Sequence, residues 1–128
     1  MNSFDAEIIH AYTRKQALED GMQVDVTATA VQVPIRFPVF LTRAVYDAYV
    51  AVPPKVIGQD EAGRLWDILW MARYGILSSP SGCEEISFTL YVRNTNGKAR
   101  LVRLKAVCGP LDLDEGQPAI TIMLPEED

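Results

Sequence analysis

The sequence predicts a single α+β domain in which helices come first and an antiparallel sheet follows. Up to about residue 77, apolar side chains recur at the three- and four-residue spacings of helices. Beyond about residue 82, apolar and polar side chains alternate, as on a strand with one buried face. The length of 128 residues fits one domain, and 48% hydrophobic residues supply a core. We expect the acidic C-terminal tail, 125–128, to be mobile.

The N-terminal part contains a short helix followed by a short strand. Thr13 and Gln16 form a capping-box pattern, which predicts a helix that stops at Gly21. Residues 22–26 alternate between apolar and polar side chains and predict a short strand. The segment 27–36 is ambiguous, since its threonines permit a helical turn whereas its β-branched residues favour extended structure.

The middle of the chain predicts two helices. Thr42 is a candidate cap for a helix of roughly residues 43–51. A longer helix, about residues 60–77, is apolar on nearly all sides, which predicts burial on several sides at the centre of the fold. Trp66 and Trp70 lie one turn apart on it, and we interpret them as a core pair rather than as a ligand-stacking wall.

The C-terminal part predicts a three-stranded antiparallel meander packed on the central helix. Its strands are expected at about residues 85–94, 99–108 and 118–124, with a turn region over 109–117. Keeping one face apolar requires that Phe88 pair with Leu104, because a slip of one residue would mix core and solvent positions. This register predicts a three-residue loop, Thr95–Gly97, with Gly97 at positive φ.

The solvent face of this meander carries a candidate binding surface. Its residues are Tyr91, Arg93, Arg103 and Lys105. Basic sheet surfaces with aromatic side chains bind single-stranded nucleic acid by stacking and phosphate contact. The alternative is a solvated face whose charges discourage aggregation, or one neutralised by the acidic loop 112–115 or the acidic tail. The net charge of −5 argues against a dedicated nucleic-acid binder.

A second candidate surface is a polar patch at the start of the long helix. It consists of Asp60, Glu61, Arg64 and Asp67. These residues are interpreted either as ordinary helix ion pairs with Arg64 or as a polar binding patch. An enzyme site of unfamiliar type would form only if three of them converged with His10 in one pocket, namely Asp60, Glu61 and Arg64.

The remaining chemistry-bearing residues predict neither a disulfide nor a metal site nor a cofactor. The register places Cys83 and Cys108 on opposite faces, so we expect free thiols, with Cys108 buried. A lone histidine, His10, is too few for a histidine metal site. No apolar run approaches the length of a membrane span, and no signal peptide is expected.

The chain as a whole resembles an uncharacterised family of small bacterial proteins, often carried on plasmids, phages and integrated elements. The resemblance covers nearly all 128 residues and rests on the segments YTRKQALEDG (12–21), VDVT (24–27), FPVFLTRAVYDAYV (37–50), GQDEAGRLWDILWM (58–71), LYVRNTNG (90–97), KAVCGP (105–110) and ITIMLPEED (120–128). The resemblance implies a bacterial cytoplasmic protein accessory to mobile DNA. It implies no activity, substrate or catalytic residue.

These observations favour a non-enzymatic binding or regulatory protein that engages another macromolecule, most plausibly a host protein. Nucleic-acid binding through the basic sheet face is the second hypothesis, and a small enzyme with an unfamiliar site is the third. An open strand edge or an uncovered apolar helix face would support a homodimer.

Overall fold

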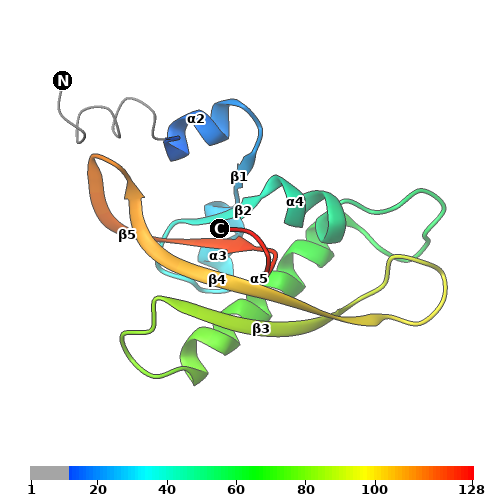
Figure 1. Ribbon diagram of the computed structural model, residues 1–128. Coiled ribbons are helices and arrows are strands. Elements are labelled where there is room, and N and C mark those ends of the chain that lie inside the picture. The colour runs from blue at the N-terminus through cyan, green and yellow to red at the C-terminus, as the bar shows by residue number, and fades with distance from the viewer. Residues whose placement is uncertain (1–11) are drawn as a thin grey trace.

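The computed structural model of the chain, which describes residues 12–128, is built around one five-stranded sheet. The strand order is β1-β2-β5-β4-β3, with β2 and β5 parallel and all other neighbours antiparallel (Figure 1). The elements are α2 (Arg14–Glu19), β1 (Gln23–Asp25), α3 (Thr27–Gln32), β2 (Val39–Thr42), α4 (Arg43–Val45), the π-helix η1 (Tyr46–Val50), α5 (Glu61–Ser78), β3 (Glu85–Val92), β4 (Arg100–Asp112) and β5 (Glu115–Met123).

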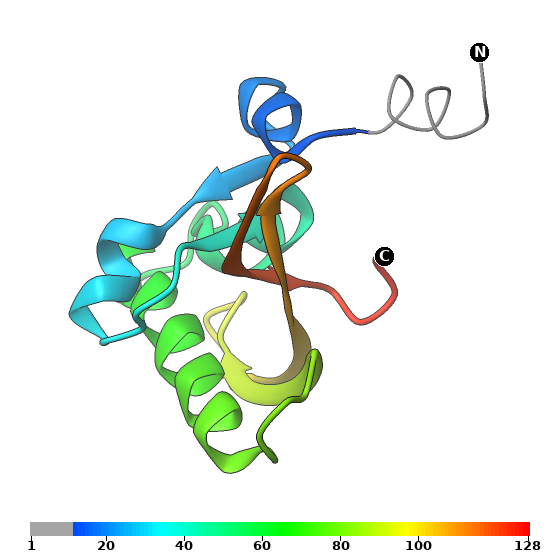
Figure 2. The same cartoon turned by 90° about the vertical axis from the view of Figure 1, so that its left-hand side faces the viewer.

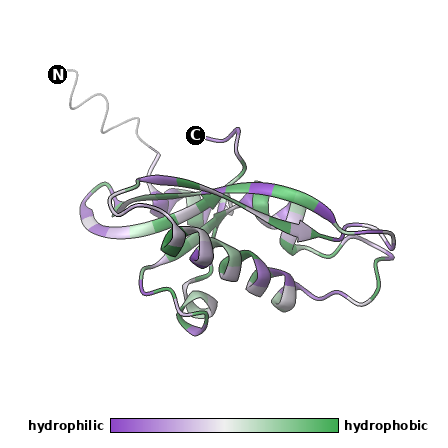
Figure 3. Cartoon of the chain, turned by 90° about the horizontal axis from the view of Figure 1, so that it is seen from below, coloured by the Kyte–Doolittle hydropathy of each residue, from purple (hydrophilic) through white to green (hydrophobic). Residues whose placement is uncertain are grey.

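The sheet and the helices form two layers. α5 and α3 lie on one face of the sheet, and the C-terminal segment runs over the other face (Figures 2 and 3). The main hydrophobic cluster fills the space between α5 and the sheet, and it includes Ile68 and Leu69 of α5 together with Leu104 and Ile122 of the strands. The fold therefore has one helix-covered face, and most of its core lies on that side.

The two central strands, β2 and β5, are buried on both faces. Val39, Phe40 and Leu41 of β2 are each at most 3% exposed, although consecutive side chains point to opposite faces. β5 is buried likewise from Ala119 to Met123. Such strands appear in a sequence as continuous apolar runs without alternation, as is usual for parallel neighbours.

The predicted three-stranded antiparallel meander is wrong. Strands near 85–94, 99–108 and 118–124 do exist, as β3, β4 and β5, but β1 and β2 join them in a mixed sheet. The four residues of β2 show no alternation of apolar and polar side chains, because the strand is buried on both faces. They also follow directly after Pro38, which gives no signal for a strand. The expected turn region over 109–117 is also strand, since β4 and β5 extend to a short hairpin turn between Asp112 and Glu115.

The predicted register between β3 and β4 is confirmed, but the predicted loop is not. Phe88 pairs with Leu104. The strands end at Val92 and begin again at Arg100, and Gly97 is not at positive φ. The connection is longer than a tight turn because Asn96 binds another loop: its side chain accepts from the N–H of Ile57 (3.0 Å) and donates to the Lys55 carbonyl (2.8 Å).

The short N-terminal elements follow their local signals. The Thr13–Gln16 capping box forms, and Gly21 adopts a φ of 76° after the helix. The ambiguous segment 27–36 begins as helix α3. The predicted helix over residues 43–51 is capped by Thr42 as expected, but it is α-helical only at first and then widens into η1.

The long helix α5 begins where the sequence predicts. The Asp60 carboxylate accepts a hydrogen bond from the N–H of Gly63 (2.6 Å) and so caps the helix. The expectation of burial on several sides is wrong: Ile68, Leu69 and Ala72 are buried under the sheet, whereas the opposite side is exposed. Within residues 12–128, no helix is long and apolar enough to cross a membrane.

Replacing Ile122 by Ala tests the central position of β5. Ile122 is fully buried between α5 and the sheet, so we expect a loss of about 2–5 kcal/mol in the free energy of unfolding. Urea denaturation followed by circular dichroism measures it. Leu113→Ala, at the exposed tip of the β4–β5 hairpin, is the control and should change stability by less than about 0.5 kcal/mol.

Candidate functional site

The outward side of α5 carries a row of exposed apolar side chains, which we name the aromatic stripe. It consists of Trp66 (37% exposed), Trp70 (48%), Tyr74 (64%) and Leu77 (66%). Spacings of four, four and three residues place them on one side of the helix. The stripe lies on the side of α5 opposite to Ile68 and Ala72, which are buried.

The position of α5 relative to β3 is set by a close approach at Gly75. A Cβ at this position would lie 3.2 Å from the Cβ of Phe88 and 3.4 Å from the Cδ1 of Ile86. The absence of a side chain at Gly75 thus lets α5 pack closely against β3, which is an edge strand of the sheet. The aromatic stripe is held beside that sheet edge as a consequence.

A groove runs between α5 and β3. One hollow of about 300 Å³ is lined by Asp67, Trp70 and Met71 from the helix and by Thr89, Leu90, Tyr91 and Leu101 from the strands. A second hollow of about 200 Å³ shares Asp67, Leu90 and Tyr91 with it and extends to Arg64 and Arg93. The shared residues place the two hollows next to one another, and we call them together the groove; it lies between the aromatic stripe and the polar start of α5.

Arg64 closes one end of this groove and is buried. Its guanidinium donates hydrogen bonds to the carbonyl oxygens of Tyr49 (3.0 Å) and Arg93 (2.9 Å) and to the side chain of Asn94 (2.5 Å). Burial and the neighbouring charge of Arg93 both lower the pKa of Arg64. Arg64 thus ties α5 to η1 and to the β3–β4 connection, which is a structural role.

The predicted polar patch is divided between two roles. Asp60 caps α5, and the carboxylate of Glu61 accepts a hydrogen bond from the Tyr46 hydroxyl (3.3 Å). Neither acid forms an ion pair with Arg64, so the interpretation as helix ion pairs is wrong. Arg64 and Asp67 line the groove. Asp67 is exposed as a residue, but partial desolvation of its carboxyl in the groove raises the pKa of that group.

The predicted basic sheet face exists, but two of its cations are held by the protein itself. The Lys105 ammonium donates to the carbonyl oxygen of Glu127 and lies 3.8 Å from a carboxylate oxygen of Glu85. The Arg93 guanidinium donates to the carbonyl oxygens of Ile57 and Thr95. These contacts leave Arg103 and Tyr91 as the exposed members of the face. Such engagement weakens the case for phosphate binding, which needs free cationic groups.

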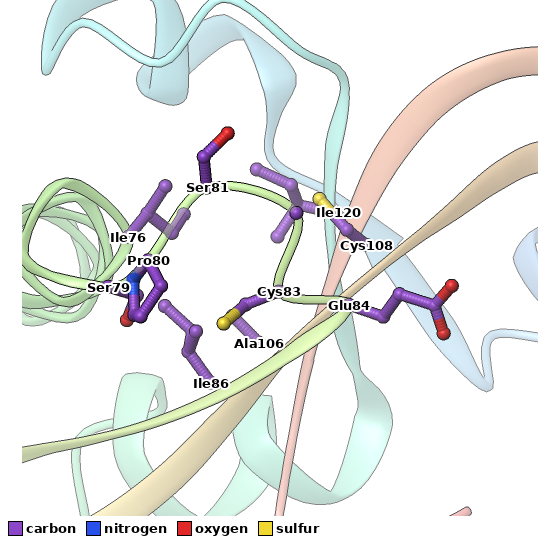
Figure 4. Close-up of a pocket in the computed structure, with 11 residues that line it drawn as sticks. Ile76, Ser79, Pro80, Ser81, Cys83, Glu84, Ile86, Ala106, Cys108 and Ile120 are labelled. Atoms are coloured by element: carbon purple, nitrogen blue, oxygen red, sulfur yellow. The ribbon is translucent and has the colours of Figure 1, made fainter.

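Both cysteines are free thiols, as predicted. They line a hollow of about 150 Å³ beside the loop that follows α5 (Figure 4). The N–H of Cys108 donates to the Glu84 carbonyl (2.7 Å), in agreement with the predicted register. The expected burial of Cys108 is wrong, because it lies near the exposed end of the β3–β4 ladder. His10, the candidate base, lies outside the described residues, and no metal-binding group of side chains exists in residues 12–128.

The aromatic stripe is the feature that the sequence interpretation missed. The signal was present, since two tryptophans, a tyrosine and a leucine follow one another at helical spacing. The apolar pattern was interpreted as core because a helix that is apolar all round is usually buried on several sides. Here the sheet covers one side of α5, and the side chains of the aromatic stripe on the other side stay exposed.

Replacing Arg64 by Ala tests its role as a tie between elements. The change leaves buried carbonyl groups without donors, so we expect a loss of about 3 kcal/mol in the free energy of unfolding. Urea denaturation measures it. Arg73→Ala, which removes a single hydrogen bond to the Pro34 carbonyl (3.0 Å), is the matched control and should cost about 1 kcal/mol or less. Equal losses in the two variants would contradict the assignment.

Replacing Asp67 by Asn tests the raised pKa of that carboxyl. Because the folded-state pKa is raised, the charged form destabilises the fold once the pH exceeds that value. Asp67→Asn should therefore be more stable than the wild type at pH 7, and the difference should vanish as the pH falls below the ordinary value of 3.8. Thermal unfolding at several pH values measures this, with Asp114→Asn on the exposed hairpin turn as control. A difference independent of pH would contradict it.

Comparison with known proteins identifies the family and nothing narrower. The whole chain, residues 1–128, matches the family described as "Family of unknown function (DUF6573)". No curated protein and no solved structure matches the chain significantly. The resemblance to an uncharacterised family is thereby confirmed, whereas a bacterial origin and an association with mobile DNA stay predictions. On this match over its full length, the chain belongs to DUF6573, a family of unknown function.

Proposed function

We propose that this protein is a non-enzymatic binding protein that engages another protein through the aromatic stripe of α5. The observation that carries the proposal is the exposure of Trp66, Trp70 and Tyr74 on one side of a rigid 18-residue helix. Tryptophan and tyrosine are enriched at the centres of protein interfaces, where they supply most of the binding energy. A contiguous exposed apolar patch of this kind commonly marks an interaction site.

The setting of the stripe favours binding over catalysis. Several polar groups of α5 have structural partners: Arg64 and Arg73 donate to backbone carbonyl groups, and Asp60 caps the helix. The stripe itself presents aromatic rings and one aliphatic side chain, which contribute contact area rather than reactive groups. Its rigid support also lowers the entropic cost of association, since the side chains sit on a helix fixed to the sheet.

The groove beside the stripe extends the proposed contact surface. Trp70 belongs to both, and Asp67 adds a carboxylate at the groove wall. A partner that places an apolar side chain in the groove and a donor near Asp67 would satisfy both features. The proposed partner is a host protein, and the proposed role is accessory to bacterial mobile DNA. The support for that narrower role is the family resemblance alone.

A double substitution, Trp66→Ala with Trp70→Ala, tests the proposal. Each tryptophan at an interface centre contributes about 2 kcal/mol or more, so the loss of either weakens binding about thirtyfold. Tagged protein is incubated with lysate of cells that carry its gene, and recovered partners are identified by mass spectrometry. The wild type should retain a specific partner that the double variant loses.

The matched control is Ile57→Ala with Leu113→Ala, which removes two exposed apolar side chains away from α5. It should retain the partner. The protein has two tryptophans, both in the stripe, so complex formation should also shift the intrinsic fluorescence emission to shorter wavelengths. Recovery of the same partner by the Trp66/Trp70 variant, in undiminished yield, would refute the proposal.

A further inference from the structure

The edge strand β3 presents unpaired backbone groups along its full length. It has eight residues and pairs with β4 on one side, and within residues 12–128 no strand pairs with its other side. The opposite edge strand of the sheet, β1, has three residues and offers little to pair with. β3 is therefore the edge at which a further strand can be added.

The backbone groups that face this open edge can be identified. The N–H of Cys108 donates to the Glu84 carbonyl, which makes these two residues a hydrogen-bonded pair of the antiparallel ladder. Hydrogen-bonded pairs alternate along such a ladder, so even-numbered residues of β3 bond to β4. The N–H and C=O groups of the odd-numbered residues point to the open edge. These residues are Glu85, Ser87, Thr89 and Tyr91.

The usual protections of a sheet edge are missing from β3. Its sequence, EISFTLYV, contains no proline and no lysine, and its pairing with β4 is free of bulges from Glu85 to Val92. Glu85 at the start is its one charged residue. A long, regular edge with a single charged residue is a template for strand pairing unless a partner covers it.

The charges at the two ends of β3 are complementary to one another. Glu84 and Glu85 lie at its start, and Arg93 follows its end. The Glu85 carboxylate lies 3.8 Å from the Lys105 ammonium of its own chain, but its side chain is 59% exposed and therefore accessible to a second cation. The hydrogen bonds of the Arg93 guanidinium go to carbonyl and amide oxygens, and among the described residues no carboxylate pairs with it. An antiparallel copy of the same strand would bring an acidic end against each basic end.

We infer that the open edge of β3 pairs with β3 of a second copy of this chain. The two strands run antiparallel about a twofold axis at Thr89, which places Thr89 opposite its own counterpart and Glu85 opposite Arg93 of the second copy. This register satisfies the alternation, since only odd-numbered residues form the new hydrogen-bonded pairs. On the core side it sets Phe88 opposite Leu90, so apolar meets apolar.

The two neighbouring registers that also satisfy the alternation are less favourable. One would centre on Phe88 and place Glu85 opposite Tyr91, the other would centre on Leu90 and place Glu85 opposite Thr95, and both leave Arg93 without a carboxylate opposite it. A pair of threonines directly opposite one another, by contrast, forms a favourable cross-strand contact. The charges therefore select the register centred on Thr89.

Such a dimer is a symmetric, closed assembly in which the two sheets become one. Because the twofold axis is perpendicular to the joined sheet, both copies of α5 lie on the same face, with the two aromatic stripes side by side. The four side chains of one aromatic stripe form a small contact surface, whereas stable interfaces bury about 800 Å² per partner. The two stripes of the dimer together present a larger contact surface to another protein. The inference rests on the backbone of β3 and does not require the proposed function.

Single cysteines test the dimer and its register together. In a Cys83→Ser, Cys108→Ser background, Thr89→Cys should form an intermolecular disulfide under mild oxidation, visible on a non-reducing gel. Directly opposite residues of a hydrogen-bonded pair lie about 5.5 Å apart at Cα, within the range of a disulfide. Ser87→Cys is the matched control, because residue 87 lies on the same face and at the same edge as residue 89. The two residues 87 of the dimer would lie about 13 Å apart along the strands, too far for a disulfide. This variant should stay monomeric on the gel.

The mass of the unmodified chain in solution provides the second measurement. Sedimentation equilibrium should give twice the 14.2 kDa of the single chain. Thr89→Asp sets two carboxylates opposite one another in the dimer and should weaken dimerisation about tenfold. The variant should still fold, because within the chain residue 89 lies opposite Arg103, which is compatible with an acidic side chain.

Three results would overturn the inference: a mass of 14.2 kDa at all concentrations, equal crosslinking of the two cysteine variants, or crosslinking of Ser87→Cys alone. A monomer that still binds another protein through Trp66 and Trp70 would leave the proposed function standing. A dimer without any other partner would leave the inference standing and count against the proposed function.

Discussion

The contact between α5 and one face of the sheet is the constraint on which the rest of the structure depends. An 18-residue helix with apolar side chains on nearly every side can bury only the side that touches a neighbour. Ile68, Leu69 and Ala72 fill that contact, and Gly75 brings the helix close to β3. The described residues provide no further layer. The exposed stripe and the groove are both consequences of this arrangement.

Arg64 connects this packing to the loops that surround it. Its guanidinium reaches η1 and the β3–β4 connection at once, while Asn94 and Asn96 of that connection bind the segments around Ala48 and Lys55. A buried arginine with carbonyl partners is costly to desolvate and specific in geometry. The end of the groove is therefore shaped by a polar network rather than by apolar contacts.

The parts of the fold that could be predicted from the sequence are those with local signals. The Thr13–Gln16 box, the Asp60 cap and the alternation that aligns Phe88 with Leu104 each depend on residues close in the chain or on one turn. β2 gives no such signal, because its four residues are buried on both faces and its parallel partner is about eighty positions away. The helical spacing of the stripe residues is visible in the sequence, but their exposure is not, since an apolar pattern does not show how many layers surround the helix.

The order of the strands has a consequence for how the chain folds during synthesis. Of the five strands of this sheet, β5 is the last to be synthesised, yet it occupies the middle of the sheet, between β2 and β4. Until it emerges, the β1–β2 pair and the α5–β3–β4 unit have no strand to join them, and each presents an apolar margin to the surroundings. The complete sheet therefore forms only after β5 has inserted between β2 and β4. Nascent chains that stall before β5 is synthesised leave apolar surface exposed and are prone to misassembly.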